Sequence, residues 1–338
     1  MASSSPDKMV LTIGTRKSKL AMLQTHAVRD ALQKNYPDYE FKIFSQDSAG
    51  DLNKVTPFRD FATKNLWTEE LEELMIGGQV DFVVHSLKDV PTNLPSTCTL
   101  GPMPPRQDSR DVLVVKKGLS YKSLSELPAG SVVGTSSVRR TAQLARKYPH
   151  LKVLDVRGNI ETRISKLDAE DSPFTCIILA AAGLLRMNIG DRIAQYLDST
   201  NSGMLYAVGQ GALGIEIRKD DTVLKQMLES IGHQETTFAS LAERSLLRTL
   251  EGGCSAPLGV EAEWVHGSEG SKKLRMRAVV VSVDGKDCAQ VELEGDVNST
   301  EAAEAFGITV AKALVEDGAG AILDVIQKDK AAKVNVTA

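Results

Sequence analysis

The sequence predicts an α/β protein with two α/β lobes and a smaller α+β unit. Three observations support this fold class. Strand and helix patterns alternate between residues 9 and 84, and the alternation restarts after prolines at 102, 104 and 105. Beyond residue 258, three strand patterns are followed by two helix patterns. Alternation is typical of βαβ units with a largely parallel sheet, whereas strands grouped before helices are typical of α+β units.

The first lobe begins with a short apolar strand pattern over 9–14, and further strands are expected over 40–44 and 80–84. Between the first two, apolar residues recur near a period of 3.6 over 18–35, which predicts an amphipathic helix. A second helix is expected over 67–76. It should end at Gly77-Gly78, because glycine commonly follows the last helical residue.

The second lobe repeats this pattern after the prolines. Strands are expected over 111–115, 131–134, 152–156 and 175–179, with helices over 137–147 and 160–167. Ligands of α/β sheets usually bind beyond the carboxyl ends of the strands. Two such lobes therefore predict a ligand site formed at strand ends.

The C-terminal third has a different pattern. A helix over 235–250 should end at Gly252-Gly253, and strands are expected over 258–265, 273–283 and 288–293. Helices follow over 299–316 and 319–327. We expect a small antiparallel sheet with helices on one face.

Composition excludes several classes of protein. Hydrophobic residues make up 42% of the 338 residues, which is enough for folded cores. The net charge is −4 and no basic stripe is present, so nucleic acid is not an expected partner. No membrane span, secretory signal or zinc-ligand spacing is apparent, and no bound metal is expected. Four widely spaced cysteines favour a reducing cytoplasm.

Several turns combine small residues with arginine. They are Gly14-Thr-Arg-Lys-Ser18, Gly134-Thr-Ser-Ser-Val-Arg-Arg140 and Arg157-Gly-Asn-Ile-Glu-Thr-Arg163, and Arg186 follows another small-residue run. Helix N-termini favour anions, and the arginine fork matches a carboxylate or phosphate. A single arginine at a turn is usually only solvated, but the repetition predicts a ligand with several negative groups. No phosphate-binding P-loop is present, which disfavours nucleotide hydrolysis.

Two further segments have functional and structural interpretations. Lys88 and Asp89 follow the expected strand 80–84, where Asp89 is either an acid/base or cation-stabilising group or a turn cap before Pro91. Cys254 follows two glycines beyond a helix, which suits an accessible thiol better than a buried one. The helix dipole would not lower its thiol pKa there. The glycine-rich run 206–216 is equally consistent with a crossover and with a ligand contact.

Together these segments resemble the porphobilinogen deaminase family. They occur in the family's order and cover about residues 9 to 328, which is far more specific than any single motif. The matching stretches are Thr15-Arg-Lys-Ser18, Val84-His-Ser-Leu-Lys-Asp-Val-Pro91, Val133-Gly-Thr-Ser-Ser-Val-Arg-Arg140, Arg157-Gly-Asn159 with Arg163, Ala207-Val-Gly-Gln-Gly-Ala212 and Leu250-Glu-Gly-Gly-Cys254.

The resemblance implies three domains. Residues 9–106 with 211–230 and residues 107–210 would form two lobes like those of type-2 periplasmic binding proteins, and 231–338 an α+β domain. The third domain would carry a dipyrromethane cofactor on Cys254 through a thioether. The members of this family are transferases of haem and tetrapyrrole biosynthesis. They join four porphobilinogen molecules head to tail on this primer, releasing ammonia and finally hydroxymethylbilane. We expect a cytoplasmic monomer.

The resemblance also implies roles for individual residues. Asp89 matches the catalytic aspartate, which would stabilise positive charge on pyrrole nitrogens and help move protons. The azafulvene left by loss of ammonia is electrophilic enough to alkylate Cys254 without a depressed thiol pKa. The cofactor-binding positions are Cys254, Lys88, Ser136, Ser137, Arg139, Arg140, Arg157, Gly158 and Arg163. The substrate-binding positions are Arg16, Ser18, Lys64, Thr135, Arg186 and Gln210.

The segment around Lys64 departs from the family pattern. The family often has Gly-Gly-Lys-Gly-Leu-Phe in a loop over the cleft, and this chain has Ala62-Thr-Lys-Asn-Leu-Trp67. Lys64 is retained without the glycines. Two other functions fit the sequence less well. A non-catalytic anion receptor leaves Cys254 and the third domain unexplained, and a cysteine hydrolase lacks a histidine base near Cys254.

Overall fold

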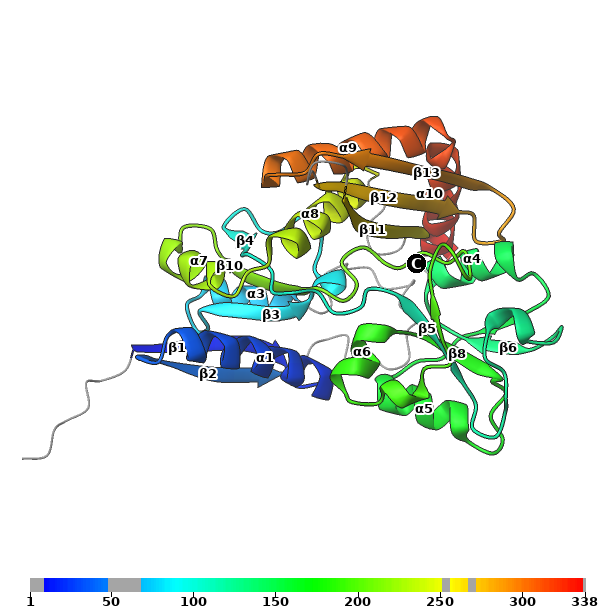
Figure 1. Ribbon diagram of the computed structural model, residues 1–338, viewed down its shortest axis with the longest axis horizontal. Coiled ribbons are helices and arrows are strands. Elements are labelled where there is room, and N and C mark those ends of the chain that lie inside the picture. The colour runs from blue at the N-terminus through cyan, green and yellow to red at the C-terminus, as the bar shows by residue number, and fades with distance from the viewer. Residues whose placement is uncertain (1–8, 48–67, 251–255, 267–271, 337–338) are drawn as a thin grey trace, which may run out of the picture. The chain divides into compact units, whose positions relative to one another are not determined.

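The computed structural model describes residues 9–47, 68–250, 256–266 and 272–336 (Figure 1). The chain divides into two compact units. Unit 1 comprises residues 1–53, 65–106 and 212–237, and unit 2 comprises residues 54–64, 107–211 and 238–338. Each unit is considered by itself below.

Unit 1 contains a five-stranded sheet. Its strand order is β2 (Tyr39–Gln46), β1 (Met9–Arg16), β3 (Phe82–Ser86), β10 (Leu213–Arg218) and β4 (Cys98–Leu100). β1 pairs in parallel with β2 and β3, whereas β10 is antiparallel to both β3 and β4. The described residues of this unit also form the helices α1 (Lys19–Asn35), α3 (Glu69–Ile76) and α7 (Thr222–Glu229) and the 3-10 turn η2 (Leu87–Asp89).

The first part of unit 2 contains a second five-stranded sheet. Its order is β7 (Lys152–Leu154), β6 (Val132–Gly134), β8 (Cys176–Ala180), β5 (Asp111–Val115) and β9 (Gln195–Leu197). β6 is parallel to β7 and β8, and β5 is antiparallel to β8 and β9. Its helical elements are α4 (Val138–Lys147), α5 (Ile160–Asp168), α6 (Ala181–Arg186), η3 (Leu124–Glu126) and η4 (Gly190–Arg192).

The two five-stranded sheets therefore have the same topology. In each, the second strand in the order has parallel neighbours on both sides, and the fourth strand is inserted antiparallel to both of its neighbours. The inserted strands are β10 in unit 1 and β5 in unit 2. The chain thus passes from the first sheet to the second before β5 and returns before β10. The expectation of largely parallel sheets was wrong, because the inserted strand contributes antiparallel pairs to each.

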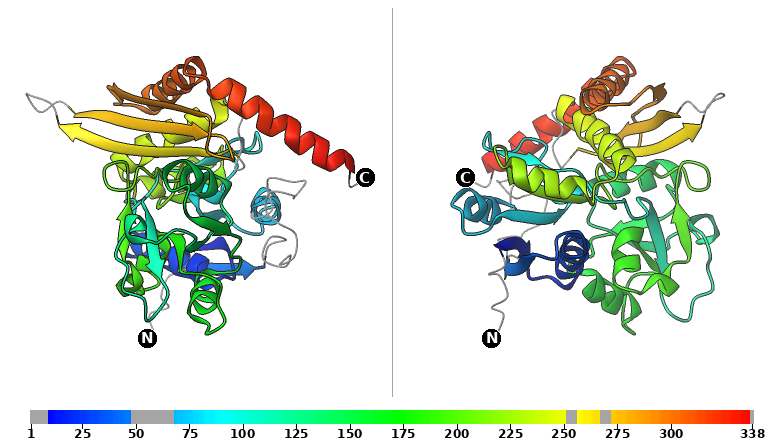
Figure 2. Two further views of the ribbon diagram at one scale, coloured as in Figure 1. Left: turned by 90° about the vertical axis from the view of Figure 1, so that its right-hand side faces the viewer. Right: turned by 60° about the vertical axis from the view of Figure 1, so that its left-hand side comes forward.

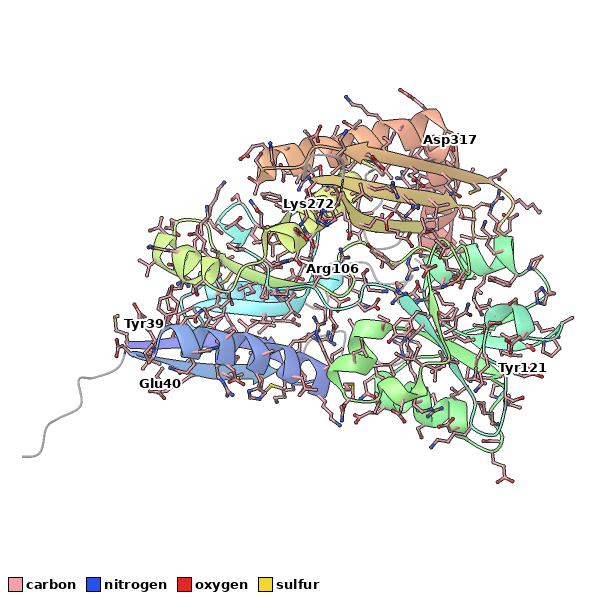
Figure 3. All side chains as sticks on the ribbon, viewed as in Figure 1. Tyr39, Glu40, Arg106, Tyr121, Lys272 and Asp317 are labelled. Atoms are coloured by element: carbon pink, nitrogen blue, oxygen red, sulfur yellow. The ribbon has the colours of Figure 1, made fainter. Side chains whose placement is uncertain are left out.

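The C-terminal part of unit 2 is an antiparallel sheet of β11 (Leu258–His266), β12 (Lys272–Val281) and β13 (Cys288–Gly295), as the sequence predicted. α8 (Gln234–Thr249) and α9 (Thr300–Glu316) lie within one residue of their predicted ranges, whereas α10 (Ala319–Val336) extends nine residues beyond its predicted end at 327. Residues of all three helices share one apolar core with the sheet. Figure 2 shows α10 as a long helix ending at the C-terminus. Asp317, labelled in Figure 3, accepts a hydrogen bond from the Gln290 backbone N–H at 2.7 Å and ties the end of α9 to β13.

Local sequence signals explain the helix starts near the predicted site. Ser18, Ser137 and Asn159 are the N-cap residues of α1, α4 and α5, and each side chain accepts a hydrogen bond from a backbone N–H in the first turn. The turns singled out in the sequence therefore lead directly into helix N-termini.

Several elements were not predicted. β4 and β9 have only three residues each and pair only at the sheet edge, and β7 ends at Leu154 rather than at residue 156. Helices α6 and α7 also had no counterpart in the sequence analysis. The three-domain division stays a prediction. No helix in the described part of the chain is both long and apolar enough to cross a membrane.

Candidate active site

In unit 1, the predicted acid lies at the carboxyl end of a buried strand. β3 ends at Ser86 and continues into η2, whose last two residues are Lys88 and Asp89. Arg16 is the last residue of β1, the parallel neighbour of β3. Its Nη1 atom lies 4.0 Å from Oδ2 of Asp89, and both side chains are partly exposed at 19% and 33%. The structure therefore brings together a carboxylate and a guanidinium that are 73 positions apart in sequence.

The same unit contains a buried group of ionisable side chains that the sequence analysis did not identify. Glu216 of β10 is fully buried, and its Oε2 lies 3.6 Å from Nε2 of buried His85 on β3. Glu72 of α3 is also buried, and its pKa is raised, mainly by desolvation and then by the charge of Glu216. A buried polar residue inside an apolar strand, as in Leu213-Gly-Ile-Glu-Ile217, was the available signal.

In unit 2, the predicted arginines occupy the first turn of α4. Ser137 caps this helix and accepts a hydrogen bond from the Arg140 backbone N–H at 3.4 Å. The hydroxyl of Thr135 accepts from the Ser137 backbone N–H at 3.2 Å, and the Ser136 hydroxyl donates to the Val156 carbonyl at 2.9 Å. These hydroxyls shape the turn that places Arg139 and Arg140.

The two guanidiniums share one buried carboxylate. Arg139 Nη1 donates to Asp111 Oδ2 at 2.8 Å, and Arg140 Nη2 donates to Asp111 Oδ1 at 2.7 Å. All three side chains are at least nine-tenths buried. The two neighbouring guanidiniums hold the pKa of Asp111 far below its ordinary value, in opposition to desolvation, which is the largest single influence and would raise it.

Backbone carbonyls and an amide complete the cluster. Arg139 Nη1 also donates to Leu205 O at 2.5 Å, and Arg140 Nη1 donates to Ile178 O at 2.8 Å. Gln210 Nε2 donates to Asp111 Oδ1 and to Ser109 O, both at 2.8 Å. Among the contacts of the described residues, Asp111 is the only carboxylate within hydrogen-bonding distance of either guanidinium. Two buried positive charges therefore face one negative charge.

The remaining predicted basic residues lie on neighbouring elements of unit 2. Arg163 Nε donates to Gly158 O at 2.7 Å, and Gly158 has a φ of +118°, a conformation that favours glycine. The carbonyl of Arg157 accepts from Lys166 Nζ at 3.0 Å. Arg186 Nη2 donates to Gly211 O at 2.7 Å, and burial lowers the pKa of Arg186 to about 10.

Asp111 is a buried member of this cluster that sequence reasoning missed. It was assigned only to the strand 111–115. The signal was a charged residue at the start of an otherwise apolar strand, Asp111-Val-Leu-Val-Val115. Such a residue is rarely buried unless it is paired, so a buried partner could have been sought.

Two predicted residues, Cys254 and Lys64, lie outside the described residues. Of the other cysteines, Cys176 is fully buried in β8, within an apolar run of the sequence. Burial raises the pKa of its thiol to about 12, so it is a poor nucleophile near neutral pH.

Comparison with known proteins connects both units to one family. The model described as "Porphobilinogen deaminase, dipyromethane cofactor binding domain" matches residues 11–226. The model described as "Porphobilinogen deaminase, C-terminal domain" matches residues 237–316. Together the two models cover most of the described chain.

Full-length relatives agree with these matches. A porphobilinogen deaminase of Schizosaccharomyces pombe is 48% identical over 319 residues, which are 94% of this chain and 94% of the relative. That of Yarrowia lipolytica is 50% identical, with 93% of this chain and 92% of the relative covered. That of Saccharomyces cerevisiae is 48% identical, with 95% and 98% covered.

Proposed function

Because this chain belongs to the porphobilinogen deaminase family, we propose that the acidic and basic side chains at its strand ends carry out that family's reaction. The enzyme is a hydroxymethylbilane synthase, a transferase of haem and tetrapyrrole biosynthesis. It joins four porphobilinogen molecules head to tail. In each step the bond to the aminomethyl nitrogen breaks, ammonia leaves, a carbon–carbon bond forms and a pyrrole carbon loses a proton. Water then releases the linear tetrapyrrole. The observation that carries this conclusion is family similarity along nearly the whole chain.

The described residues fit the anionic part of a dipyrromethane cofactor. Arg139 and Arg140 form a buried cluster with one more positive charge than Asp111 neutralises, and Arg140 Nε is buried without a partner among the described residues. A buried excess of positive charge favours an anionic ligand. The residues proposed to hold the cofactor are Lys88, Ser136, Ser137, Arg139, Arg140, Arg157, Gly158 and Arg163, with Cys254 as the covalent attachment point. When bound, the group supplies the terminal pyrrole carbon to which the first substrate is joined.

Asp89 is proposed as the catalytic carboxylate. It is the last residue of η2, and its side chain is one-third exposed, so a substrate can reach it. Loss of ammonia places positive charge on the substrate's pyrrole nitrogen, and a nearby carboxylate stabilises that charge mainly in the transition state. The same carboxylate can accept the pyrrole proton. Arg16, 4.0 Å away, balances its negative charge between steps.

The residues proposed to bind substrate carboxylates are Arg16, Ser18, Lys64, Thr135, Arg186 and Gln210. Their burial differs greatly. Arg16 is partly exposed, whereas Thr135 and Gln210 are each only 1% exposed and contact the protein's own backbone. A direct contact is therefore best supported for Arg16. Thr135 and Gln210 would act mainly by fixing the neighbouring donors.

We also propose that the enzyme acts in the cytoplasm as a monomer, on a small molecule and without nucleic acid or membrane. Cys98, Cys176 and Cys288 are free thiols, which supports a reducing compartment. The net charge of −4 gives no basic surplus for a polyanion. Sedimentation velocity at the enzyme's working concentration tests the monomer directly.

The function is tested with the purified full-length chain. We expect its intact mass to exceed the sequence mass by one dipyrromethane, and porphobilinogen to be consumed with release of one ammonia per molecule. Ammonia and the linear tetrapyrrole product are measured in the same reaction. A protein that carries no adduct and releases no ammonia would contradict the proposed function.

A further inference from the structure

The structure assigns Asp111 as a positioning residue for Arg139 and Arg140, a role that rests on the proposed function of these arginines in binding carboxylates. Asp111 accepts one hydrogen bond from each guanidinium, at 2.8 and 2.7 Å. It therefore determines the orientation of both guanidinium groups before a ligand binds. We infer that it sets the geometry with which this cluster meets the carboxylates of the cofactor and of the growing chain.

The backbone holds Asp111 rigidly. It is the first residue of β5, where it is paired with Ala180 of β8 on one side and Leu197 of β9 on the other. A residue paired in register on both sides has little freedom to move. Its short side chain also has few rotamers, so the carboxylate is a fixed reference point. A charge fixed in this way pre-organises the donors around it.

The contacts of the two arginines differ. Arg140 uses Nη1 for Ile178 O and Nη2 for Asp111, so both terminal nitrogens have partners. Arg139 uses only Nη1, which contacts both Asp111 and Leu205 O. Nε and Nη2 of Arg139 have no hydrogen-bond partner among the described residues and are not completely buried. The geometry points to Arg139 as the guanidinium that Asp111 presents to a ligand.

Gln210 links this cluster to the second chain crossover. Its Nε2 atom bonds Asp111 Oδ1 and also Ser109 O, and the Gly211 carbonyl accepts bonds from Arg186 Nη2 and from the Gln107 backbone N–H. The segments before β5 and before β10 are thereby held together within unit 2. Asp111 thus receives donors from one helix, α4, and from one crossover, and its loss should disturb both.

The test compares Asp111→Asn with Asp168→Asn. Asp168 is a matched control because it binds Arg192 through two bonds of 2.8 and 2.9 Å in the same lobe, with both side chains mostly buried. Asparagine removes the charge and keeps the size. The readouts are the fraction of protein that carries the dipyrrole by intact mass, the KM and kcat of that loaded fraction with porphobilinogen, and the thermal midpoint.

We expect both variants to unfold at a lower temperature than the wild type. Only Asp111→Asn should also show reduced cofactor loading or a raised KM. Its loaded fraction should fall, or the KM of its loaded fraction should rise, by about tenfold, the effect of losing about one charge-assisted hydrogen bond. Asp168→Asn should load and bind like the wild type. Wild-type loading and KM in Asp111→Asn, or equal losses in Asp168→Asn, would overturn the assignment.

If Asp111→Asn does not fold, Asp111→Glu keeps the proposal testable. Glutamate retains the charge but moves it by one methylene, so we expect near wild-type heat stability with a raised KM and a nearly unchanged kcat. An unchanged KM would contradict a positioning role. A wild-type protein with no dipyrrole adduct would instead refute the proposed function, so the two failures are distinguishable.

Discussion

The carboxylate of Glu216 lies 3.6 Å from the imidazole Nε2 of His85, and both side chains are almost completely excluded from solvent. Neither Glu216 oxygen nor this nitrogen has a hydrogen-bond partner among the described residues. Glu72, on the helix α3, adds a second carboxylate whose pKa is raised by burial and by the charge of Glu216. Unit 1 therefore buries two carboxyl groups and one imidazole close together, on β3, which leads to Asp89, and on the elements β10 and α3.

This arrangement predicts a pH-dependent stability. A carboxyl group whose pKa is raised in the folded state binds its proton more tightly there than in the unfolded chain. Its stabilising contribution to the folded state is therefore fully present below pH 4.5 and is lost as the pH rises through the folded-state pKa. Glu72→Gln should remove this loss and raise the thermal midpoint relative to the wild type, more at pH 7 than at pH 4.5. Glu73→Gln, an exposed change on the same helix, is the control. Parallel midpoint curves for the Glu72 variant and the wild type would show that folding does not raise the pKa of Glu72.

Cys254→Ser should give protein without the covalent dipyrrole, because a serine hydroxyl is a far weaker nucleophile than a thiol. Intact mass of wild type and variant measures this directly. Cys288→Ser is the control, since Cys288 is a free, half-buried thiol on β13. The cofactor-free variant should also unfold at a lower temperature, because a ligand bound only to the folded state stabilises it. If the wild type and Cys254→Ser carry the same adduct, the cofactor is attached to another residue.

Asp89→Asn should retain the cofactor and bind substrate, yet lower kcat by about 100-fold or more, the usual range for losing an acid/base group. Asparagine keeps the shape but loses the charge that would face the pyrrole nitrogen. Ammonia release is measured in protein whose cofactor is confirmed by mass, and Asp220→Asn, an exposed change in the same unit, serves as the control. A near wild-type rate would leave Asp89 as a turn residue before Pro91.

Arg140→Lys should be destabilising although it keeps the charge. The guanidinium reaches Ile178 O and Asp111 with two different nitrogens, and a single ammonium cannot take both positions. We expect a loss of about 1–3 kcal/mol for the lysine variant, and about 3–5 kcal/mol for Arg140→Leu. Both changes should also reduce cofactor loading, and Arg139→Leu should do the same.

The measurement is thermal unfolding together with intact mass. Arg146→Lys, on the exposed side of the same helix, should change stability by less than about 0.5 kcal/mol. If Arg140→Lys is as stable and as fully loaded as this control, the two-nitrogen arrangement is dispensable.

Gly211→Ala should be strongly destabilising at the crossover before β10. Gly211 has a φ of +88°, and an added Cβ would lie 2.4 Å from Gln107 O. Gly118→Ala is a matched control, because Gly118 has a φ of +86° but nothing within 4 Å of the added Cβ. The control should lose about 1–2 kcal/mol from backbone strain alone. The Gly211 variant should lose clearly more in thermal unfolding, and equal losses would mean that the crossover relaxes without cost.

Sequence alone determined the elements that depend on local chemistry. Helical patterns located α1, α4, α5 and α8, and the expected starts of α1, α4 and α5 lie within one residue of the N-caps Ser18, Ser137 and Asn159. The family motifs also identified the turns that carry the arginines and the strand end that carries Asp89. These features are encoded within a few neighbouring residues, so a single chain is enough to predict them.

Tertiary structure decided which distant residues meet. β10 is inserted beside β3 although more than 120 positions separate them, and this insertion makes the sheet of unit 1 mixed and creates the His85–Glu216 contact. In unit 2, β5 makes the other five-stranded sheet mixed in the same way. In the sequence, Asp111 indicates only the start of a strand. In the structure, α4 places Arg139 and Arg140 within hydrogen-bonding distance of its carboxylate. Pairing of this kind depends on the antiparallel insertion of one strand and on the burial of charge, and neither leaves a periodic signal in the sequence.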